Sequence, residues 1–442
     1  MIQVLRQPTF AALFSAQVVA LLGTGLLTIA LGLLAYDLAE GRAGAVLGTA
    51  LTIKMVAYVG LSPVAQALVQ HLPRRVVLIT ADLVRAGVAL CLPFVTEVWQ
   101  IYALIFVLQA ASATFTPAFQ ATIPDILPDE AEYTRALSLS RLAYDIENLA
   151  SPALAGLLLT VMSYNWLFLG TVAGFAVSAL LVWGAQVPSA QSSTAQRPFS
   201  ERLTRGTRIY LATPRLRGLL ALNMAAAATS AFVLVNTVVL VRSYMGGDES
   251  DLALALAAYG AGSMAMALVL PRLLDKLTDR PVMITGAFGL VVIGGSLGLL
   301  IGAGLTWTWL LIGWAGLGAL YSAVLTPSGR LLRRSAHAED RPAVFAAQFA
   351  LSHACWLITY PLAGWSGAVW GLSPTFLVLA AVALAAALLA LRVWPSGTSD
   401  VVPHDHPDLP PDHPHLRAHR DGGRHAHSFV IDDEHRVWPT NG

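Results

Sequence analysis

The chain has 442 residues and a formal net charge of +1. Apolar residues make up 56% of it and charged residues only 12%, against roughly 25% charged residues in soluble domains. These values exclude an ordinary soluble protein, and the near-neutral charge gives nucleic-acid binding no electrostatic basis. Both cysteines, Cys91 and Cys355, lie within apolar runs, so disulfides are not expected.

Twelve apolar runs in the chain are long enough to cross a bilayer as helices, which takes about 20 residues each. They lie near 9–36, 44–70, 76–96, 99–123, 136–162, 164–185, 215–242, 251–273, 281–304, 306–329, 342–368 and 373–393. The first run is too long for the apolar part of a cleavable signal peptide, so no such peptide is expected. The sequence therefore predicts an all-α membrane protein with twelve transmembrane helices.

The distribution of Lys and Arg over the loops predicts the orientation, because short cytoplasmic loops collect these residues. Arginines gather in segment 186–214 and in the loops after the second, eighth and tenth runs. The loops on the other side carry mainly acids, namely Asp37, Glu40, Asp248, Glu249 and Asp251. We therefore expect both termini in the cytoplasm of a bacterium and the protein in its inner membrane. Pro198–Leu211 fits either a short helix on the membrane surface or a solvated linker.

Short sequence patterns recur in the same order in the two halves of the chain. Leu72-x-x-Arg75 returns as Leu277-x-x-Arg280, Ser112-Ala113 with Thr116-Pro117 returns as Ser322-Ala323 with Thr326-Pro327, and Leu154-Ala155-Gly156 returns as Leu362-Ala363-Gly364. Two parallel six-helix halves around a midplane site are typical of rocking secondary transporters. The expected division is a half over 1–185, a cytoplasmic linker over 186–214, a half over 215–393 and a disordered cytoplasmic tail over 394–442.

This organisation makes residues 1–393 resemble the major facilitator superfamily. The loop signature of that family, close to Asp-Arg-x-Gly-Arg-Arg, has its counterpart in Gln70-His71-Leu72-Pro73-Arg74-Arg75, where Gln and Pro replace the Asp and the Gly. The second-half copy, Asp275-Lys276-Leu277-Thr278-Asp279-Arg280, matches better. The resemblance implies that these loops help to hold the cytoplasmic side closed. The gating residues that it implies are Arg74, Arg75, Asp275, Lys276, Asp279 and Arg280.

A second resemblance concerns the direction of transport. Ser151-Pro152-Ala153-Leu154-Ala155-Gly156 is similar to the Gly-Pro-x-x-Gly-Gly signature of the drug/proton antiporters in the same superfamily. It implies export rather than import.

The fifth apolar run contains Asp145 and Glu147, although a charge at that depth costs at least about 2.5 kcal/mol. Such residues face a bundle interior or a water-filled path. Aligning the two Leu-Ala-Gly repeats places His353 opposite Asp145 and Cys355 opposite Glu147. Residues two apart on a helix point about 200° apart, so we expect one of each pair in the path, namely Asp145, which shares a face with Asn148, and His353. Cys355 also fits simple packing, since a free cysteine behaves as a small hydrophobe.

Three further charges lie within apolar runs. Lys54 is expected to face the cavity and to pair with Asp145 or Glu147, either as a structural ion pair or as part of coupling. Asp82 and Arg85 are three residues apart and so share a helix face. They are expected to form a structural pair that braces the neighbouring basic loop.

The tail differs in composition from the rest of the chain, because it holds eight of the eleven histidines. These are His404, His406, His413, His415, His419, His425, His427 and His435. Imidazole suits Ni, Zn, Cu and Fe, and His-rich tracts are typical of metal binding, so all eight are expected to be metal ligands. A solvated tail without this role is the alternative. A His-rich cytoplasmic tail on such an exporter resembles the NreB-type nickel-resistance exporters.

These observations predict a monomeric, proton-coupled exporter of a divalent transition metal, nickel or cobalt before zinc. A multidrug, macrolide or siderophore exporter with a metal-buffering tail is the alternative. The intramembrane polar residues disfavour a non-transporting receptor, and no nucleotide-binding or catalytic motif supports an enzyme. The expected partners are the bilayer, protons and a small ion or molecule, and no tightly bound cofactor is expected.

Overall fold

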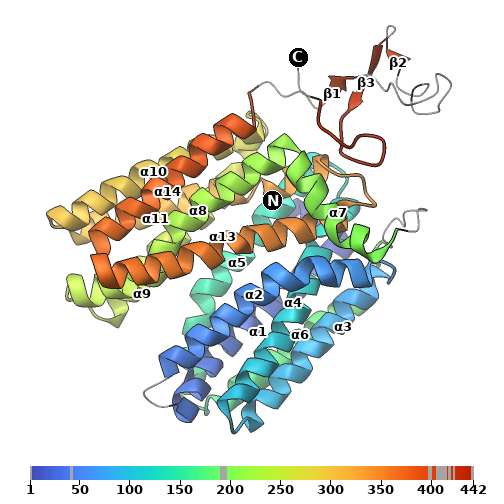
Figure 1. Cartoon of the computed structure of the whole chain (residues 1–442). Coiled ribbons are helices and arrows are strands. Elements are labelled where there is room, and N and C mark those ends of the chain that lie inside the picture. The colour runs from blue at the N-terminus through green and yellow to red at the C-terminus, as the bar shows by residue number, and fades with distance from the viewer. Residues whose placement is uncertain are drawn as a thin grey trace.

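The structure, a computed structural model, describes residues 2–39, 43–189, 197–396, 401–404, 416, 420–421 and 424–439. Its helices form two groups of six, which meet at the end where α7 lies and diverge away from it (Figure 1). The first group consists of α1 (Pro8–Ala39), α2 (Ala43–Val69), α3 (Arg74–Cys91), α4 (Val98–Ile126), α5 (Glu130–Leu159) and α6 (Asn165–Gly184). The second consists of α8 (Pro214–Val239), α9 (Glu249–Leu274), α10 (Asp279–Ala303), α11 (Trp307–Leu325), α13 (Arg341–Trp370) and α14 (Leu372–Val393).

Composition explains why these helices cross a membrane. Eleven helices in the described part of the chain are long and apolar enough to span a bilayer. The twelfth, α5, is 30 residues long but carries Arg141, Asp145 and Glu147 in its apolar stretch. The predicted all-α membrane fold with two six-helix halves is confirmed. One detail differs, because the tenth apolar run ends at Leu325 and the arginines that follow lie on a separate short helix, α12 (Ser328–Arg334).

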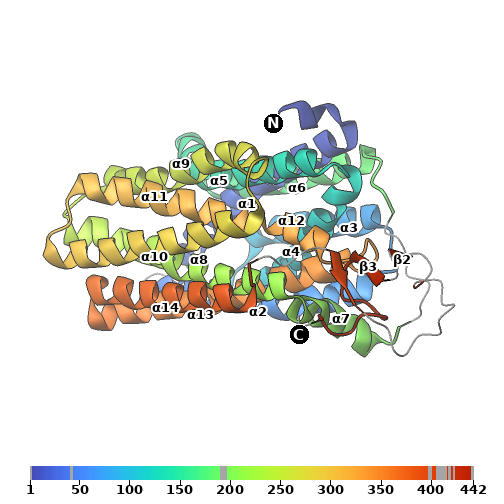
Figure 2. The same ribbon diagram turned by 90° about the horizontal axis from the view of Figure 1, so that it is seen from above.

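The two halves meet along two helix pairs. Helix α5 packs against α9, and α2 packs against α13, and the two pairs lie on opposite sides of the molecule (Figure 2). Within the halves, α1 packs on α6 and α8 on α14. A large apolar core fills the second half, whereas the first half contains separate clusters toward its two ends. The halves therefore contact each other through only a few helices, as rocking bodies must.

Two glycines allow α9 and α11 to cross closely. A Cβ added at Gly262 would overlap the carbonyl of Ala315, and one added at Gly318 would overlap the carbonyl of Tyr259. Because the obstructing atoms belong to the backbone, we expect Gly318→Ala to destabilise the second half by about 1–3 kcal/mol, the usual cost of overpacking. Thermal unfolding in detergent checks this. Gly295→Ala is the matched control, since open space surrounds that position, and an equal loss of stability in both variants would contradict the packing argument.

The linker between the halves contains helix α7 (Phe199–Ala212), which packs against α13. Gly206 permits the close approach, because a side chain there would overlap the carbonyl of Ala343. The Tyr210 hydroxyl donates to Gln348 Oε1 at 2.5 Å, and Arg205 is buried. The sequence allowed either a surface helix or a solvated linker here. The structure has a helix, and it packs against α13 of the protein. Residues 190–196 of the linker lie outside the described residues.

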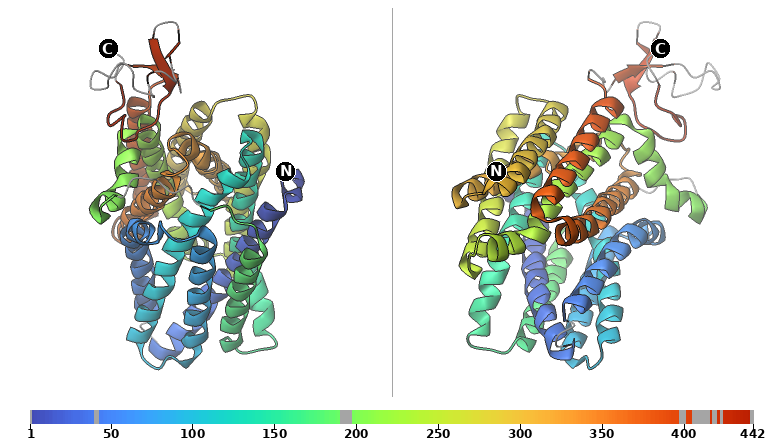
Figure 3. Two further views of the ribbon diagram at one scale, coloured as in Figure 1. Left: turned by 90° about the vertical axis from the view of Figure 1, so that its right-hand side faces the viewer. Right: turned by 60° about the vertical axis from the view of Figure 1, so that its left-hand side comes forward.

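The described tail residues differ from the expectation of disorder. Strands β1 (Val401–Pro403), β2 (Arg420–Asp421) and β3 (Arg424–Ser428) pair antiparallel in the order β1-β3-β2, at the end of the molecule near α7 (Figure 3). Phe429 and Ile431 are buried in the core of the second half together with Trp394. These apolar side chains, overlooked beside the many histidines, give the tail a surface with which to dock. His406, His413, His415 and His419 lie outside the described residues, as does the side chain of His425.

Candidate functional site

The central part of α5 carries a buried ion pair. Arg141 Nη2 lies 2.7 Å from Asp145 Oδ1, and Arg141 Nε lies 3.3 Å from Asp145 Oδ2. The same Nε donates to Ser263 Oγ of α9 at 3.1 Å, so the pair joins the two halves. Asp145 is only 3% exposed. Arg141 was missed in the sequence, although its i,i+4 spacing from Asp145 is the usual signal of a helix ion pair.

A series of four aromatic side chains in the second half starts at this ion pair. The Arg141 guanidinium lies 4.7 Å from the centroid of the Tyr321 ring. Tyr321 lies 6.0 Å from Tyr259 and 6.3 Å from Trp356, measured between ring centroids, and Trp356 lies 5.0 Å from Tyr360. All four rings are half-buried. They come from α9, α11 and α13, and we call Tyr259, Tyr321, Trp356 and Tyr360 the aromatic cluster.

A second polar group lies where α2 meets α13. The Lys54 ammonium lies 5.7 Å from the Tyr58 ring centroid, and that ring lies 4.8 Å from the His353 ring. His353 Nδ1 lies 2.7 Å from the carbonyl oxygen of Phe349. Because a carbonyl only accepts, Nδ1 carries the proton and Nε2 is left as an acceptor. In the described part of the chain, no hydrogen bond or ion pair joins His353 to Asp145, so the expected pair of path residues is not in direct contact.

Glu147 faces away from the Arg141–Asp145 pair. A Cβ added at Gly25 of α1 would lie 3.6 Å from Glu147 Oε1, whereas Asp145 points toward α9. The Lys54 ammonium is close enough to the Glu147 carboxylate to interact with it electrostatically. Of the two partners expected for Lys54, the structure therefore has Glu147. Asp145 is paired with Arg141 instead.

The other two expected path residues add little to this site. Cys355 is buried, and its thiol donates to the carbonyl of Leu351 at 3.4 Å. These contacts fit the simple packing role that was the alternative for this residue. The side chain of Asn148 lies outside the described residues.

At the end of the molecule near α7, ion pairs cross between the halves. Asp125 of α4 binds Arg74 of its own half at 2.5 Å and Arg341 of α13 at 2.6 Å. Each carboxylate oxygen takes one guanidinium, so this single acid holds an arginine from each half.

A mirrored arrangement lies beside it. Asp279 of α10 holds Arg330 at 2.8 Å and Arg334 at 2.9 Å. Both arginines also bind Glu130, at the start of α5 in the other half, with 2.7 Å to Arg330. We call the whole set the ion-pair belt. Its members are Arg74, Asp125, Glu130, Asp279, Arg330, Arg334 and Arg341.

Comparison with known proteins identifies the family of the chain. The sequence model of the Major Facilitator Superfamily matches residues 13–241 and 219–430. The chain belongs to the major facilitator superfamily. It is therefore a multi-pass membrane protein of that superfamily.

Curated relatives within the superfamily are distant. An uncharacterised MFS-type transporter of Bacillus subtilis, YfiS, is 24% identical over 48% of this chain and 52% of its own length. Macrolide efflux protein A of Streptococcus pyogenes is 26% identical over 40% of this chain and 45% of its own length. The chain spans about half the length of these relatives.

Solved structures of other transporters show the same fold. The human organic anion transporter MFSD10 has a TM-score of 0.73 and 12% identity, covering 87% of this chain and 99% of its own. A bacterial homologue of the iron transporter ferroportin, in an outward-facing state, has a TM-score of 0.67 and 15% identity, covering 87% and 98%. At identities this low, the similarity shows a shared fold but not a shared substrate.

The residues of the major facilitator loop signature have different contacts in this chain. Arg74 and Asp279 belong to the ion-pair belt. Arg75 instead donates to the backbone carbonyl of Trp183 in its own half, and Arg280 to that of Trp394 at the start of the tail. The exposed members are Asp275 and Lys276. The first-half signature, which departs from the family pattern, thus still contributes one arginine to the closed end.

The Asp82–Arg85 pair is present but braces a different region from the one expected. Asp82 and Arg85 are in contact, and the Ser178 hydroxyl of α6 donates to Asp82 at 2.7 Å. The Arg85 guanidinium lies 4.2 Å from the ring centroid of Phe115 and 4.5 Å from that of Phe175. The pair therefore ties α3 to α4 and α6, rather than holding Arg74 or Arg75.

Proposed function

We propose that this transporter exports amphipathic organic compounds by alternating access. The observation that carries the proposal is the aromatic cluster beside the buried Arg141–Asp145 pair. Tyr and Trp present a large apolar face with a polar edge, and small-molecule sites are lined mainly by apolar and aromatic groups with a few polar ones. The similarity to macrolide efflux proteins supports the same class of substrate and makes a macrolide the first compound to test.

The orientation of the molecule in the membrane follows from the ion-pair belt and the positive-inside rule, and export is the direction that the similarity to macrolide efflux proteins supports. The belt lies at the end that carries α7 and most of the arginines, which we assign to the cytoplasm of a bacterial cell. With the belt formed, that end is held closed, and the diverging ends of the two halves face the opposite side. Breaking the belt would expose the central residues to the cytoplasm, so that a substrate could reach them from that side.

We assign proton coupling to Glu147 rather than Asp145. The Asp145 carboxylate is held by Arg141 of the same helix, so its charge is already offset and the two residues move together. Glu147 is half-buried, and among the described residues none donates a hydrogen bond to it. A carboxyl in that setting is able to gain and lose a proton as the halves move, with Lys54 as a nearby cation.

Export of a divalent metal is the second candidate. It is favoured by one observation, the grouped histidines of the tail. The centre supports it less. In the part of the chain that the structure describes, the tail group is the only set of three or more potential metal ligands. His353 has one nitrogen on a carbonyl, and Cys355 is engaged in packing.

A transport assay separates the two candidates. Inside-out vesicles with an imposed proton gradient are expected to accumulate a radiolabelled macrolide, and not radioactive nickel, above vesicles that lack the transporter. Glu147→Gln should remove most of the gradient-driven uptake, because it cannot exchange a proton. Glu339→Gln, at an exposed position, is the matched control. Nickel uptake without macrolide uptake would reject the organic substrate, and unchanged uptake by Glu147→Gln would reject the proton carrier.

A further inference from the structure

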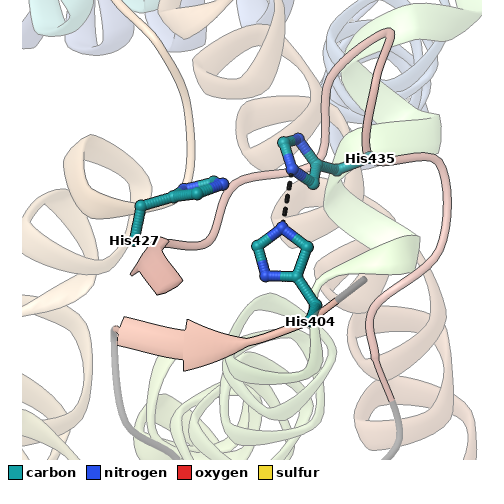
Figure 4. A group of neighbouring side chains, drawn as sticks. All are labelled: His404, His427 and His435. Atoms are coloured by element: carbon teal, nitrogen blue, oxygen red, sulfur yellow. Dashed lines mark hydrogen bonds between the residues drawn. The ribbon is translucent and has the colours of Figure 1, made fainter. Parts of the chain in front are cut away.

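Three histidines that lie far apart in the tail sequence converge in space. His404 follows β1, His427 is in β3, and His435 lies in the turn beyond it, and their rings face a common point (Figure 4). One nitrogen of each lies within 4.8 Å of the others. The Nε2 atoms of His404 and His435 are 3.0 Å apart. In a tetrahedral zinc site, with bonds of about 2.0–2.1 Å, ligand nitrogens lie about 3.4 Å apart, so small ring rotations suffice to bring all three onto one ion.

Neighbouring groups fix which nitrogen points inward. His435 Nδ1 lies 2.8 Å from Asp432 Oδ1, and a carboxylate accepts, so this ring presents its Nε2 lone pair to His404. His427 Nδ1 lies 2.9 Å from the Ser428 carbonyl, which likewise leaves Nε2 as the ligand atom. A carboxylate that orients a histidine in this way is a recurrent partner of metal ligands. The contact between His404 and His435 then needs a proton on His404 Nε2, and this proton must move to Nδ1 when a metal binds.

The turn that carries His435 is docked on the second half. Asp432 lies 3.2 Å from His337 Nε2, in the loop between α12 and α13. Asp433 binds Arg205 of α7 at 2.7 Å, and Arg205 binds Asp340 of the same loop at 2.5 Å. Burial alone would raise the pKa of Asp433, but the hydrogen bonds from Arg205 and Arg197 hold it below the usual range.

We propose that His404, His427 and His435 bind one divalent first-row transition-metal ion, and that the ion fastens the tail onto the α12–α13 loop. Imidazole nitrogen is a favoured ligand of Zn²⁺ and Ni²⁺. The ion would join the end of β1 to a turn 31 residues further along the chain. The loop that the turn clasps runs between Arg334 and Arg341, both members of the ion-pair belt. Metal binding is thereby coupled to the rigidity of the closed end.

Titration of the full chain in lipid nanodiscs with Zn²⁺ alone tests the site. The tightest binding event is expected to weaken at least tenfold in His404→Ala/His427→Ala, and by about 10–100-fold in Asp432→Asn, which removes only the orienting carboxylate. His71→Ala, at an exposed position on another loop, should bind as the wild type does. A fourfold variant, in which Ala replaces His406, His413, His415 and His419, tests whether the other tail histidines account for zinc binding. Unchanged affinity in the double variant, or loss of the tight event in the fourfold variant alone, would overturn the proposal.

Hydrogen exchange tests the fastening. Adding Zn²⁺ should slow amide exchange in residues 427–435 and in the loop 335–340 of the wild type, and in neither segment of the double variant. A variant whose tail fails to dock would give the same result, so His404→Gln, which keeps a polar side chain of similar size, is a second variant. Its amide exchange without metal is first compared with that of the wild type, and equal exchange shows that its tail is docked. Tight binding without slower exchange in the loop would refute the coupling to the closed end.

Discussion

Asp145→Asn is expected to destabilise the folded protein by about 3–5 kcal/mol, because it leaves the Arg141 guanidinium, whose side chain is only 15% exposed, without its counter-charge. The Ser263 hydroxyl and the Tyr321 ring would remain beside Arg141, but neither carries a negative charge. Thermal unfolding of the purified protein measures the loss. Transport should fall as well, since the guanidinium lies at the junction of α5 and α9.

A second substitution identifies the partner. Arg141→Met, added to Asp145→Asn, should restore most of the stability, because a buried pair replaced by uncharged groups leaves no unpaired ion. Lys54→Met, added to Asp145→Asn, should not. The sequence alone favoured Lys54 as one possible partner, so rescue by Lys54→Met and not by Arg141→Met would contradict the geometry. Glu147→Gln on the same helix is the control for loss of a carboxylate that accepts no described hydrogen bond.

Asp125→Asn is expected to open the end that the ion-pair belt closes. The change releases both Arg74 and Arg341, and hydrogen bonds to charged groups contribute about 1.5–3 kcal/mol each. Ser62 reports the opening, since its hydroxyl donates across the two halves to the Ala346 carbonyl at 3.3 Å and it is 1% exposed. In a background of Cys91→Ser and Cys355→Ala, maleimide labelling of Ser62→Cys should become roughly 10–100-fold faster, since about 1.4 kcal/mol corresponds to a factor of ten.

The matched control for this experiment is Asp275→Asn. Asp275 is an acid of the superfamily loop signature, but it is exposed. Labelling of Ser62→Cys should therefore stay at the rate of the parent. Equal acceleration by Asp125→Asn and Asp275→Asn would mean that general loss of negative charge, rather than the bridge between Arg74 and Arg341, controls the closed end.

Apolar patterning predicted most of the fold, because a membrane helix must satisfy its backbone within itself and show lipid a continuous apolar surface. The repeats added the two-half organisation. The tail was the exception. Its composition is polar on average, but docking depends on Phe429 and Ile431, which lie close together in the sequence and share one buried site. An average over the tail conceals so short an apolar segment.

The candidate site was predicted in part. The cost of intramembrane charge drew attention to Asp145, Glu147 and Lys54 in the sequence, and their role in transport stays a prediction. Which of them pair depends on how helices cross. Arg141 was within reach of sequence reasoning, through its spacing from Asp145. The belt was not, because Asp125 and Arg341 come from different halves, and only the assembled fold brings them together.

The seat of α7 determines what this helix does when the halves rock. It is held to α13 by Gly206, by the Tyr210–Gln348 bond and through the Arg205–Asp340 pair. Toward α2 it borders an open crevice of about 500 Å³, lined by Gly60, Pro63 and Val64 and by residues of α7. Helix α7 is thus packed mainly on the second half, although Arg202 also contacts His71 in the loop after α2. If the two halves rock, we expect this crevice to widen and close, and a molecule bound in it to hinder the motion without contacting the central polar residues.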